Sequence, residues 1–402
     1  MAGPVPLEPA DLVSVLAPFG ESKTLPAEAY TSEEIFAWEL GELFASTWVC
    51  VGRIDDLLAP GQVRAVSVAA EGVLLARDSV GTVRAFSNVC RHRGHELAPI
   101  GDPVDARLIR CPYHSWSYRL DGTLRAAPTF TETPGFESSD HPLLELSTGT
   151  FGGWLWVDLS GGAPTVEDHF GNLSEMIAPY ETGRLRTAAT HSYTVKANWK
   201  IVVENYNECY HCTTIHPELC QVTPPESGTD HQPTGMWLGG SMDLKPHAET
   251  MSLDGRSDGV PLGGVTGILA RQVLYLTVFP NLLLSLHPDY VMTHLLTLIG
   301  PDETLVECSW LFPPEAWERP GFDPAYAVDF WDITNREDWQ ACEGVMRGMR
   351  NRGYRPGPLS NWEGTVYQFL TVMGHLYRGE GLVVPTAPER IGSAYSPNTG
   401  RS

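Results

Sequence analysis

The stretch CRHRGHELAPIGDPVDARLIRCPYHSW, residues 90–116, decides the fold of the first half of this chain. It contains a Cys-x-His pair, Cys90 and His92, and eighteen residues later a Cys-x2-His pair, Cys111 and His114. Each pair falls in a segment with Gly or Pro, which is typical of loops that turn at strand ends. Two thiols and two imidazoles on two such loops predict a metal centre held by both.

Two kinds of metal centre use two cysteines and two histidines. One is a structural zinc ion. The other is a Rieske [2Fe–2S] cluster, in which both cysteines bind one iron and both histidines bind the other. Zinc sites favour a pair of cysteines and a separate pair of histidines, whereas each loop here supplies one of each. The mixed pairing favours the iron–sulfur cluster, and His95 is left out because it breaks the spacing.

The residues around this motif predict a small all-β domain over 45–162. The segment 62–88 alternates β-branched and polar residues, and Asp121-Gly122 between two β-like runs predicts a hairpin. Before this domain, residues 31–44 predict an amphipathic helix that Thr31 would cap. We assign that helix to an N-terminal segment, residues 1–44, which is expected to pack on the second domain.

The second domain, 163–402, is predicted to be mixed. Its expected elements are a helix over 198–215, strands over 273–278, 282–286, 290–299 and 304–311, and a long helix over about 323–352. Helices on an antiparallel sheet make this an α+β domain. The predicted fold class is therefore α+β, with an N-terminal all-β domain and a C-terminal antiparallel sheet covered by helices.

A second cluster of metal-capable side chains is NYNECYHCTTIHP, residues 205–217. Its Cys209-x2-Cys212 pair could be read as a zinc or redox pair. A redox pair needs a positive, partly exposed helix start, but Glu204 and Glu208 bring negative charge to this stretch. The chain also has no second Cys-x2-Cys. We therefore expect both cysteines to be small buried side chains.

The same stretch supplies two histidines for a mononuclear metal. Residues three apart share a helix face, so Glu208 and His211 are expected to lie together, with Asn205 on the same side. Pro217 disfavours helix at His216, so the chain can open there and bring both imidazoles to one ion.

A mononuclear non-haem Fe(II) site needs a carboxylate beside two histidines. The best candidate is Asp338, because the predicted long helix places it on a mostly apolar face, where an unpaired carboxylate is costly. Glu337 is the weaker rival, and Asp332 lies on a solvated face. The alternative for Asp338 is an ordinary surface acid.

With both clusters placed, the chain resembles the alpha (terminal oxygenase) subunits of the Rieske non-haem iron oxygenases over nearly its full length. The motifs are the two Cys/His loops, the acid-x2-His-x4-His pattern at 208–216, and EDWQACE at 337–343. The resemblance implies a helix-grip catalytic domain, oxidation by O2, and a homotrimer or larger ring. In that ring Glu208 would link His114 of one chain to His211 of the next.

The resemblance also implies partners and a substrate class. The chain has no nucleotide-binding Gly fingerprint, so electrons from NAD(P)H must arrive through a separate reductase, with or without a ferredoxin. Glu rather than Asp at position 208 is similar to the branch that oxidises quaternary ammonium compounds. That branch implies hydroxylation of an N-methyl carbon and release of formaldehyde. An aromatic cage would suit such a cation, and the available rings are Trp199, Tyr206, Tyr210, Trp237 and Tyr290.

Two other functions stay open. One is hydroxylation or O-demethylation of an aromatic acid, for which Arg271 is a candidate anchor. The other is a Rieske electron carrier without catalysis, against which the second cluster argues.

The composition of the chain limits its possible binding partners and its expected cellular location. A formal charge of −22 argues against binding nucleic acid or an anionic membrane surface. The start of the chain lacks a secretory leader, and the apolar run 273–288 is broken by Pro280, so we expect a cytoplasmic protein. Eight cysteines without a secretory signal do not predict a disulfide framework.

Overall fold

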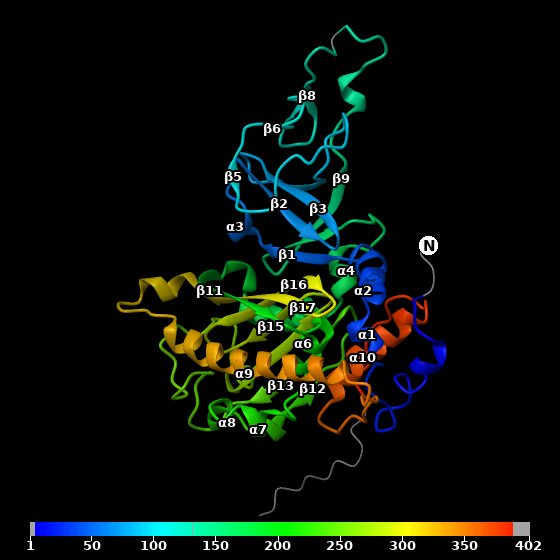
Figure 1. The fold of residues 1–402 in the computed structure, drawn as a ribbon. Coiled ribbons are helices and arrows are strands. Elements are labelled where there is room, and N and C mark those ends of the chain that lie inside the picture. Colours follow the sequence, from blue (N-terminus) through cyan, green and yellow to red (C-terminus); the bar gives the residue numbers. More distant parts are fainter. Residues whose placement is uncertain (1–4, 131, 389–402) are drawn as a thin grey trace, which may run out of the picture.

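The computed structural model describes residues 5–130 and 132–388, which form two domains stacked along the long axis of the molecule (Figure 1). The N-terminal domain contains a seven-stranded antiparallel sheet in the order β1-β10-β9-β4-β3-β2-β5 and a small three-stranded sheet, β6-β7-β8. The strands are β1 (Val49–Arg53), β2 (Gln62–Val68), β3 (Glu71–Arg77), β4 (Val83–Ser87), β5 (Val104–Asp105), β6 (Ile109–Arg110), β7 (Ser117–Tyr118), β8 (Leu124–Ala126), β9 (Glu145–Phe151) and β10 (Trp154–Asp158), with the short helix α3 (Ile54–Leu57) after β1.

The predicted hairpin at Asp121-Gly122 is confirmed, since Tyr118 of β7 pairs with Leu124 of β8. Gly122 has φ +82°, and a Cβ at this position would lie 2.5 Å from the Phe86 ring. Only glycine fits both the left-handed backbone and this close approach. The hairpin therefore packs directly on the core that surrounds Cys90.

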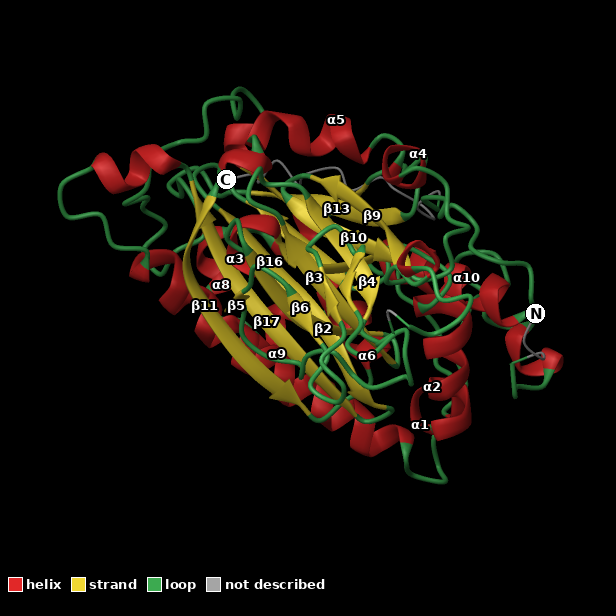
Figure 2. Cartoon of the chain, turned by 90° about the horizontal axis from the view of Figure 1, so that it is seen from above, coloured by secondary structure: helices red, strands yellow, loops and turns green. Residues whose placement is uncertain are grey.

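The C-terminal domain is built on a second antiparallel sheet, in the order β11-β17-β16-β15-β14-β13-β12. Its strands are β11 (Arg186–Val195), β12 (Thr229–Asp230), β13 (Trp237–Asp243), β14 (Gln272–Val278), β15 (Leu282–Leu286), β16 (Val291–Gly300) and β17 (Glu303–Phe312). Its helices are α4 (Val166–Phe170), α5 (Leu173–Ile177), α6 (Trp199–Tyr206), α7 (Cys212–Ile215), α8 (Leu219–Val222), α9 (Ala325–Met349) and α10 (Gly364–Tyr377). Figure 2 shows α9 lying across one face of this sheet.

The predicted strands from 273 to 311 and the long helix are confirmed as β14 to β17 and α9, which establishes the α+β class. β11, β12, β13 and α10 were not predicted. The single helix expected over 198–215 is wrong, because α6 ends at Tyr206 and helix resumes only at Cys212. Asn207 ends α6: its side-chain amide donates to the Val203 carbonyl at 2.6 Å and to the Thr277 hydroxyl at 2.9 Å.

The N-terminal segment also differs from the prediction. It contains α1 (Glu28–Thr31), α2 (Glu33–Glu39) and a π-helical turn, η2 (Leu40–Phe44). Ser32, not Thr31, caps α2, because the backbone is extended at Ser32 and its side chain accepts from the Ile35 N–H.

Buried charges hold this segment on the C-terminal domain. Glu39 of α2 pairs with Lys200 of α6 at 2.6 Å, and both side chains are fully buried. Tyr30 donates a hydrogen bond to Glu204 at 2.7 Å. Figures 1 and 2 both show α1 and α2 beside α10 at one side of the sheet. Within residues 5–130 and 132–388, no helix combines the length and the apolar character needed to cross a membrane.

Candidate active site

The four residues predicted for the cluster lie together beside the small sheet of β6, β7 and β8. Figure 1 shows this sheet at the end of the N-terminal domain that is farther from the C-terminal domain. Cys90 and Cys111 are buried and are not in a disulfide. Burial raises the pKa of Cys90, and the neighbouring Cys111 thiol adds to this effect. The His92 and His114 rings lie with their centroids 4.7 Å apart. Each loop thus contributes one thiol and one imidazole to the same small volume.

This donor set fits a two-iron cluster. The Nδ1 atoms of His92 and His114 are buried and have no hydrogen-bond partner. Buried polar atoms in proteins nearly always have one, so two orphaned ring nitrogens beside two thiols indicate a missing ligand. Trp116 stacks on His92 with an interplanar angle of 7°, which fixes the ring. His95 is exposed and its Nδ1 faces the Glu96 carbonyl, so it is not one of the candidate cluster ligands.

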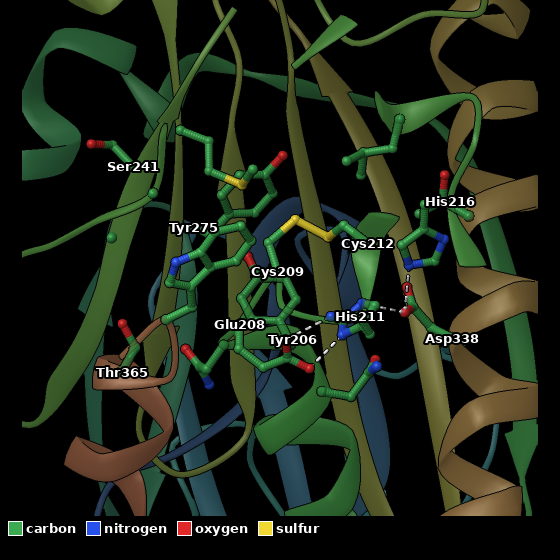
Figure 3. A pocket seen from close by; sticks show the side chains of 18 of the residues that line it. Tyr206, Glu208, Cys209, His211, Cys212, His216, Ser241, Tyr275, Asp338 and Thr365 are labelled. Atoms are coloured by element: carbon green, nitrogen blue, oxygen red, sulfur yellow. Dashed lines mark hydrogen bonds and ion pairs between the residues drawn. A yellow bond between two sulfur atoms is a disulfide. The ribbon is translucent and has the colours of Figure 1, made fainter. Parts of the chain in front are cut away.

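The second cluster is shaped by a capped turn rather than by one continuous helix. Glu208 lies in the turn between α6 and α7, and its carboxylate accepts from the backbone N–H groups of Tyr210 and His211. The same carboxylate accepts from Nδ1 of His211 (Figure 3). Glu208 and His211 therefore lie together as expected, but for a different physical reason from the shared helix face that the spacing suggested.

Two histidines and one carboxylate converge across the gap between α7 and α9. Asp338 Oδ1 lies 3.0 Å from His216 Nε2 and 3.4 Å from His211 Nε2 (Figure 3). One ligand atom from each of the three residues lies within 4.8 Å of the other two. This is the arrangement of a 2-His-1-carboxylate metal site.

Outer carboxylates orient both imidazoles. His211 Nδ1 donates to Glu208, and His216 Nδ1 donates to Glu337 at 2.7 Å. Each Nδ1–H is therefore occupied, so Nε2, which faces Asp338 in both rings, is the nitrogen that can bind a metal when it gives up its proton. Glu337, the weaker rival in the sequence, lies behind His216 rather than among the converging atoms.

The charges of this site suit a divalent cation. Burial alone would raise the pKa of Asp338, but hydrogen bonds from His211 and His216 outweigh burial and lower this pKa to about 2. Burial would lower the pKa of His211, yet Asp338 and Glu208 raise it to about 10. Without a metal, protons on the imidazoles offset the carboxylates. A divalent ion at the Nε2 atoms would replace those protons, so the donor set fits Fe(II).

His211, His216 and Asp338, the candidate metal triad, line one side of a cavity of about 110 Å³. Its aromatic lining consists of Tyr206, Tyr275, Trp331, Trp339 and Trp362, and Asn205 also lines it. The Tyr206 and Tyr275 ring centroids are 6.0 Å apart, and those of Tyr275 and Trp331 are 6.3 Å apart.

Only Tyr206 among the aromatic residues proposed from sequence lines this cavity. Trp199, Trp237 and Tyr290 are buried in the core, and Tyr210 is 61% exposed. Tyr275, Trp331, Trp339 and Trp362 were not among the rings proposed from the sequence. The spacing along the predicted long helix did place Trp331 on the same face as Asp338, and that placement was the available signal.

Cys209 and Cys212 also line the cavity, and they are joined in a disulfide (Figure 3). The expectation of two separate buried thiols is wrong. The turn before α7 brings the two Cα atoms to 4.9 Å, which is within the range for a disulfide.

The fold and the paired sites define a terminal oxygenase with a Rieske domain and a mononuclear iron domain. Residues 47–137 match the Rieske [2Fe–2S] domain family, and residues 182–379 match the catalytic domain of the ring hydroxylating alpha subunit family. The chain belongs to the Rieske oxygenase alpha subunits, as the resemblance predicted. It is thus the oxygenase component of a multicomponent enzyme that uses O2 and depends on a reductase.

Among the relatives that resemble this chain are oxygenase subunits of glycine betaine and carnitine monooxygenases. The glycine betaine monooxygenase oxygenase subunit of Chromohalobacter salexigens is 31% identical over 84% of this chain and 82% of its own length. The carnitine monooxygenase oxygenase subunit of Acinetobacter baumannii is 35% identical over 83% of this chain and 86% of its own. A solved structure of the quaternary ammonium Rieske monooxygenase CntA with an inhibitor superposes with a TM-score of 0.77, at 23% identity, covering 93% of this chain and 99% of that one.

Proposed function

We propose that this oxygenase subunit hydroxylates an N-methyl group of a quaternary ammonium compound. The observation that carries the proposal is the cavity whose walls are Tyr206, Tyr275, Trp331 and Trp339 and which opens on the metal triad. A quaternary ammonium head cannot lose its charge, and aromatic faces attract such a cation. The names of the relatives point to the same substrate class.

In this proposal His211, His216 and Asp338 hold Fe(II), and Cys90, His92, Cys111 and His114 hold the [2Fe–2S] cluster. When bound, the iron supplies the activation of O2. The protein's own part is to orient the ligands and the substrate. Glu208 and Glu337 hold the two Nδ1–H groups. Asn205 lines the cavity beside them and would donate a hydrogen bond to a bound polar group.

The reaction balances with O2 and one equivalent of NAD(P)H. One oxygen atom enters a C–H bond of the N-methyl group, and the other leaves as water with two electrons from NAD(P)H and two protons. The N-hydroxymethyl product then breaks its C–N bond. The nitrogen keeps the electron pair, and a tertiary amine, formaldehyde and one proton are released.

Electron delivery between copies of the chain is part of the proposal. Figure 1 shows the strands β6 and β8, between which the ligand loop with Cys111 and His114 lies in the sequence, at the opposite end of the molecule from α7. Because the two sites of one chain lie so far apart, we propose a homotrimer in which His114 of one copy meets Glu208 of the next. A reductase, with or without a ferredoxin, would reduce the cluster. We also propose domain limits of 1–44, 45–162 and 163–402, supported by the end of β10 at Asp158 and the start of α4 at Val166.

Formaldehyde release tests the proposal. Iron-loaded protein is given NADH, a surrogate reductase and, separately, a panel of quaternary ammonium compounds and aromatic acids. We expect formaldehyde in equal amount to the NADH consumed, with ammonium compounds only. A hydroxylated aromatic product without formaldehyde would instead support the aromatic-acid alternative. Iron content is measured in parallel, and we expect about three atoms per chain, two in the cluster and one in the mononuclear site.

A further inference from the structure

The turn between α6 and α7 carries a disulfide among functional residues. Cys209 and Cys212 are joined, whereas the six other cysteines of the chain are free. Glu208 directly precedes the first cysteine, and His211 directly precedes the second. The ring that the bond closes therefore contains a ligand of the candidate metal site. It also contains the Tyr210 and His211 N–H groups that donate to Glu208.

Stabilising the fold is a poor explanation of this bond. A disulfide stabilises a protein mainly by restricting the unfolded chain, and the effect grows with the length of the loop that it closes. Cys209 and Cys212 are three residues apart, so the bond restricts the unfolded chain little. The turn also has other support, because the Cys212 N–H donates to the Cys209 carbonyl at 3.2 Å and Glu208 accepts from two further N–H groups. The turn should therefore survive reduction of the bond, but with more freedom.

The disulfide forms part of the cavity wall. Both cysteines line the cavity, and Figure 3 shows the bond beside His211. Cys209 is half-buried, whereas Cys212 is 3% exposed. Thiol–disulfide exchange depends on access to the sulfur that is attacked. A small thiol would therefore attack Cys209, and the Cys212 sulfur would leave.

The acidic residues beside the pair do not prevent this chemistry. In the sequence, Glu204 and Glu208 argue against a redox pair because of their negative charge. In the structure Glu204 accepts from the Tyr30 hydroxyl at 2.7 Å, and Glu208 accepts from two backbone N–H groups and from His211 Nδ1. Both carboxylates are thus engaged by donors, which offsets part of their charge at the sulfur atoms.

We propose that Cys209 and Cys212 form a reversible dithiol–disulfide switch that sets how firmly the turn holds Glu208 and His211. In the disulfide form the two Cα atoms are held 4.9 Å apart, and the turn presents its N–H groups to Glu208. In the dithiol form the turn samples other conformations, so Glu208 is in place for a smaller fraction of the time. The switch does not depend on which substrate the oxygenase takes.

Hydrogen peroxide is the oxidant of this switch, and a small dithiol is its reductant. Two electrons and two protons that reach O2 without insertion into a C–H bond give hydrogen peroxide, so the oxygenase can itself supply the oxidant. One cysteine thiol attacks the peroxide, breaks its O–O bond and becomes a sulfenic acid as water leaves. The other thiol then displaces a second water and forms the S–S bond. In the reverse direction the dithiol is oxidised to its own disulfide, and each cysteine regains a proton.

The redox state of the pair is measured on the full-length protein with both metal centres loaded. The protein is treated with dithiothreitol and then with hydrogen peroxide. Samples from each stage are denatured with N-ethylmaleimide, digested and analysed by mass spectrometry. We expect the peptide with residues 209–212 to carry no label at first, two labels after reduction and none after peroxide. A peptide labelled at every stage, or at none, would overturn the switch.

Hydrogen–deuterium exchange measures how firmly the turn is held. We expect the Tyr210 and His211 amides to exchange about tenfold faster in the dithiol form, the size expected if about one residue regains its backbone freedom. The iron content should be the same in both forms, because His211, His216 and Asp338 are unchanged. Equal exchange in the two forms, or loss of iron on reduction, would overturn the inference.

Serine variants show whether this pair is responsible. Joint Cys209→Ser and Cys212→Ser replacement removes the bond, so exchange should match the reduced native protein and ignore peroxide. The control is Cys220→Ser, which removes a free thiol whose Sγ lies 3.4 Å from the Cys212 carbonyl oxygen. It should respond to both reagents as the native protein does. A response in the double variant, or its loss in Cys220→Ser, would exclude the pair as the switch.

Discussion

Replacing Glu337 by Gln should weaken the mononuclear iron site without removing any of its ligands. Glu337 Oε2 accepts from His216 Nδ1 at 2.7 Å, and the His216 side chain is 2% exposed. The carboxylate fixes which nitrogen carries the proton and raises the basicity of the Nε2 atom that faces Asp338. Gln can keep the hydrogen bond, because its carbonyl oxygen accepts in the same place, but it removes the charge.

The expected loss follows from this difference. A hydrogen bond to a charged group contributes roughly 1.5–3 kcal/mol and a neutral one roughly 0.5–1.5 kcal/mol. The midpoints of these ranges differ by about 1.25 kcal/mol, which corresponds to a little under tenfold in iron affinity. Mutating a residue that hydrogen-bonds to a metal ligand typically lowers metal affinity by roughly 10–100-fold. The expected loss lies near the lower end of that range because Gln keeps the hydrogen bond to His216.

Competition with a chelator of known iron affinity measures the effect. The absorption and EPR signals of the [2Fe–2S] cluster should not change, because Glu337 belongs to the other domain. The control is Asp329→Asn, which removes the same charge from an exposed position on α9. The reasoning fails if Glu337→Gln binds iron as the native protein does, or if Asp329→Asn loses as much affinity.

Three further changes have distinct outcomes. Asp338→Asn should keep the cluster signals but lower the iron content from about three to about two atoms per chain and abolish formaldehyde release; retention of the third iron would exclude Asp338 as a ligand. Glu208→Gln should keep both metal centres and stop turnover coupled to NADH, whereas full activity would exclude the bridging role. Burial raises the pKa of Glu204 from 4.5 to about 7, so the native protein should lose up to about 3 kcal/mol of unfolding free energy as the pH rises between these values. Glu204→Gln should remove this loss and be the more stable form at pH 8, as urea denaturation at pH 5 and pH 8 would show; equal pH dependence would contradict the assignment.

The sequence predicted the elements whose physical cause is local. The Cys-x-His and Cys-x2-His spacings identify the cluster loops without reference to the rest of the fold. The 25-residue helix α9 has a periodic apolar face, so the position of Asp338 on that face could be read from spacing alone. The strands β14 to β17 are apolar and bounded by turns, and their limits were predicted to within two residues.

Features that depend on tertiary contacts were not predictable in this way. The end of α6 depends on Asn207, whose side chain reaches across to Thr277 on β14. Tyr275 reaches the cavity only because β14 pairs with β13 and β15 in the observed register. Neither contact leaves a periodic signal in the sequence, so the predicted helix is too long and, of the five rings proposed, only Tyr206 lines the cavity.

The geometry of Glu208 bears on the proposed transfer between copies of the chain. Its carboxylate already accepts from the backbone of Tyr210 and His211 and from His211 Nδ1. An ionised carboxylate has about four lone-pair sites, so about one acceptor site is left for a donor from outside. If Nδ1 of His114 binds the cluster, Nε2–H is the donor that remains on that ring. Because Asp is one methylene shorter than Glu, we expect it at this position to hold the turn before α7 or to reach a neighbouring imidazole, but not both. Glu208→Asp should therefore lower electron transfer while the iron content stays native, and unchanged single-turnover reduction of the iron would show that Glu208 only holds the turn of Tyr210 and His211.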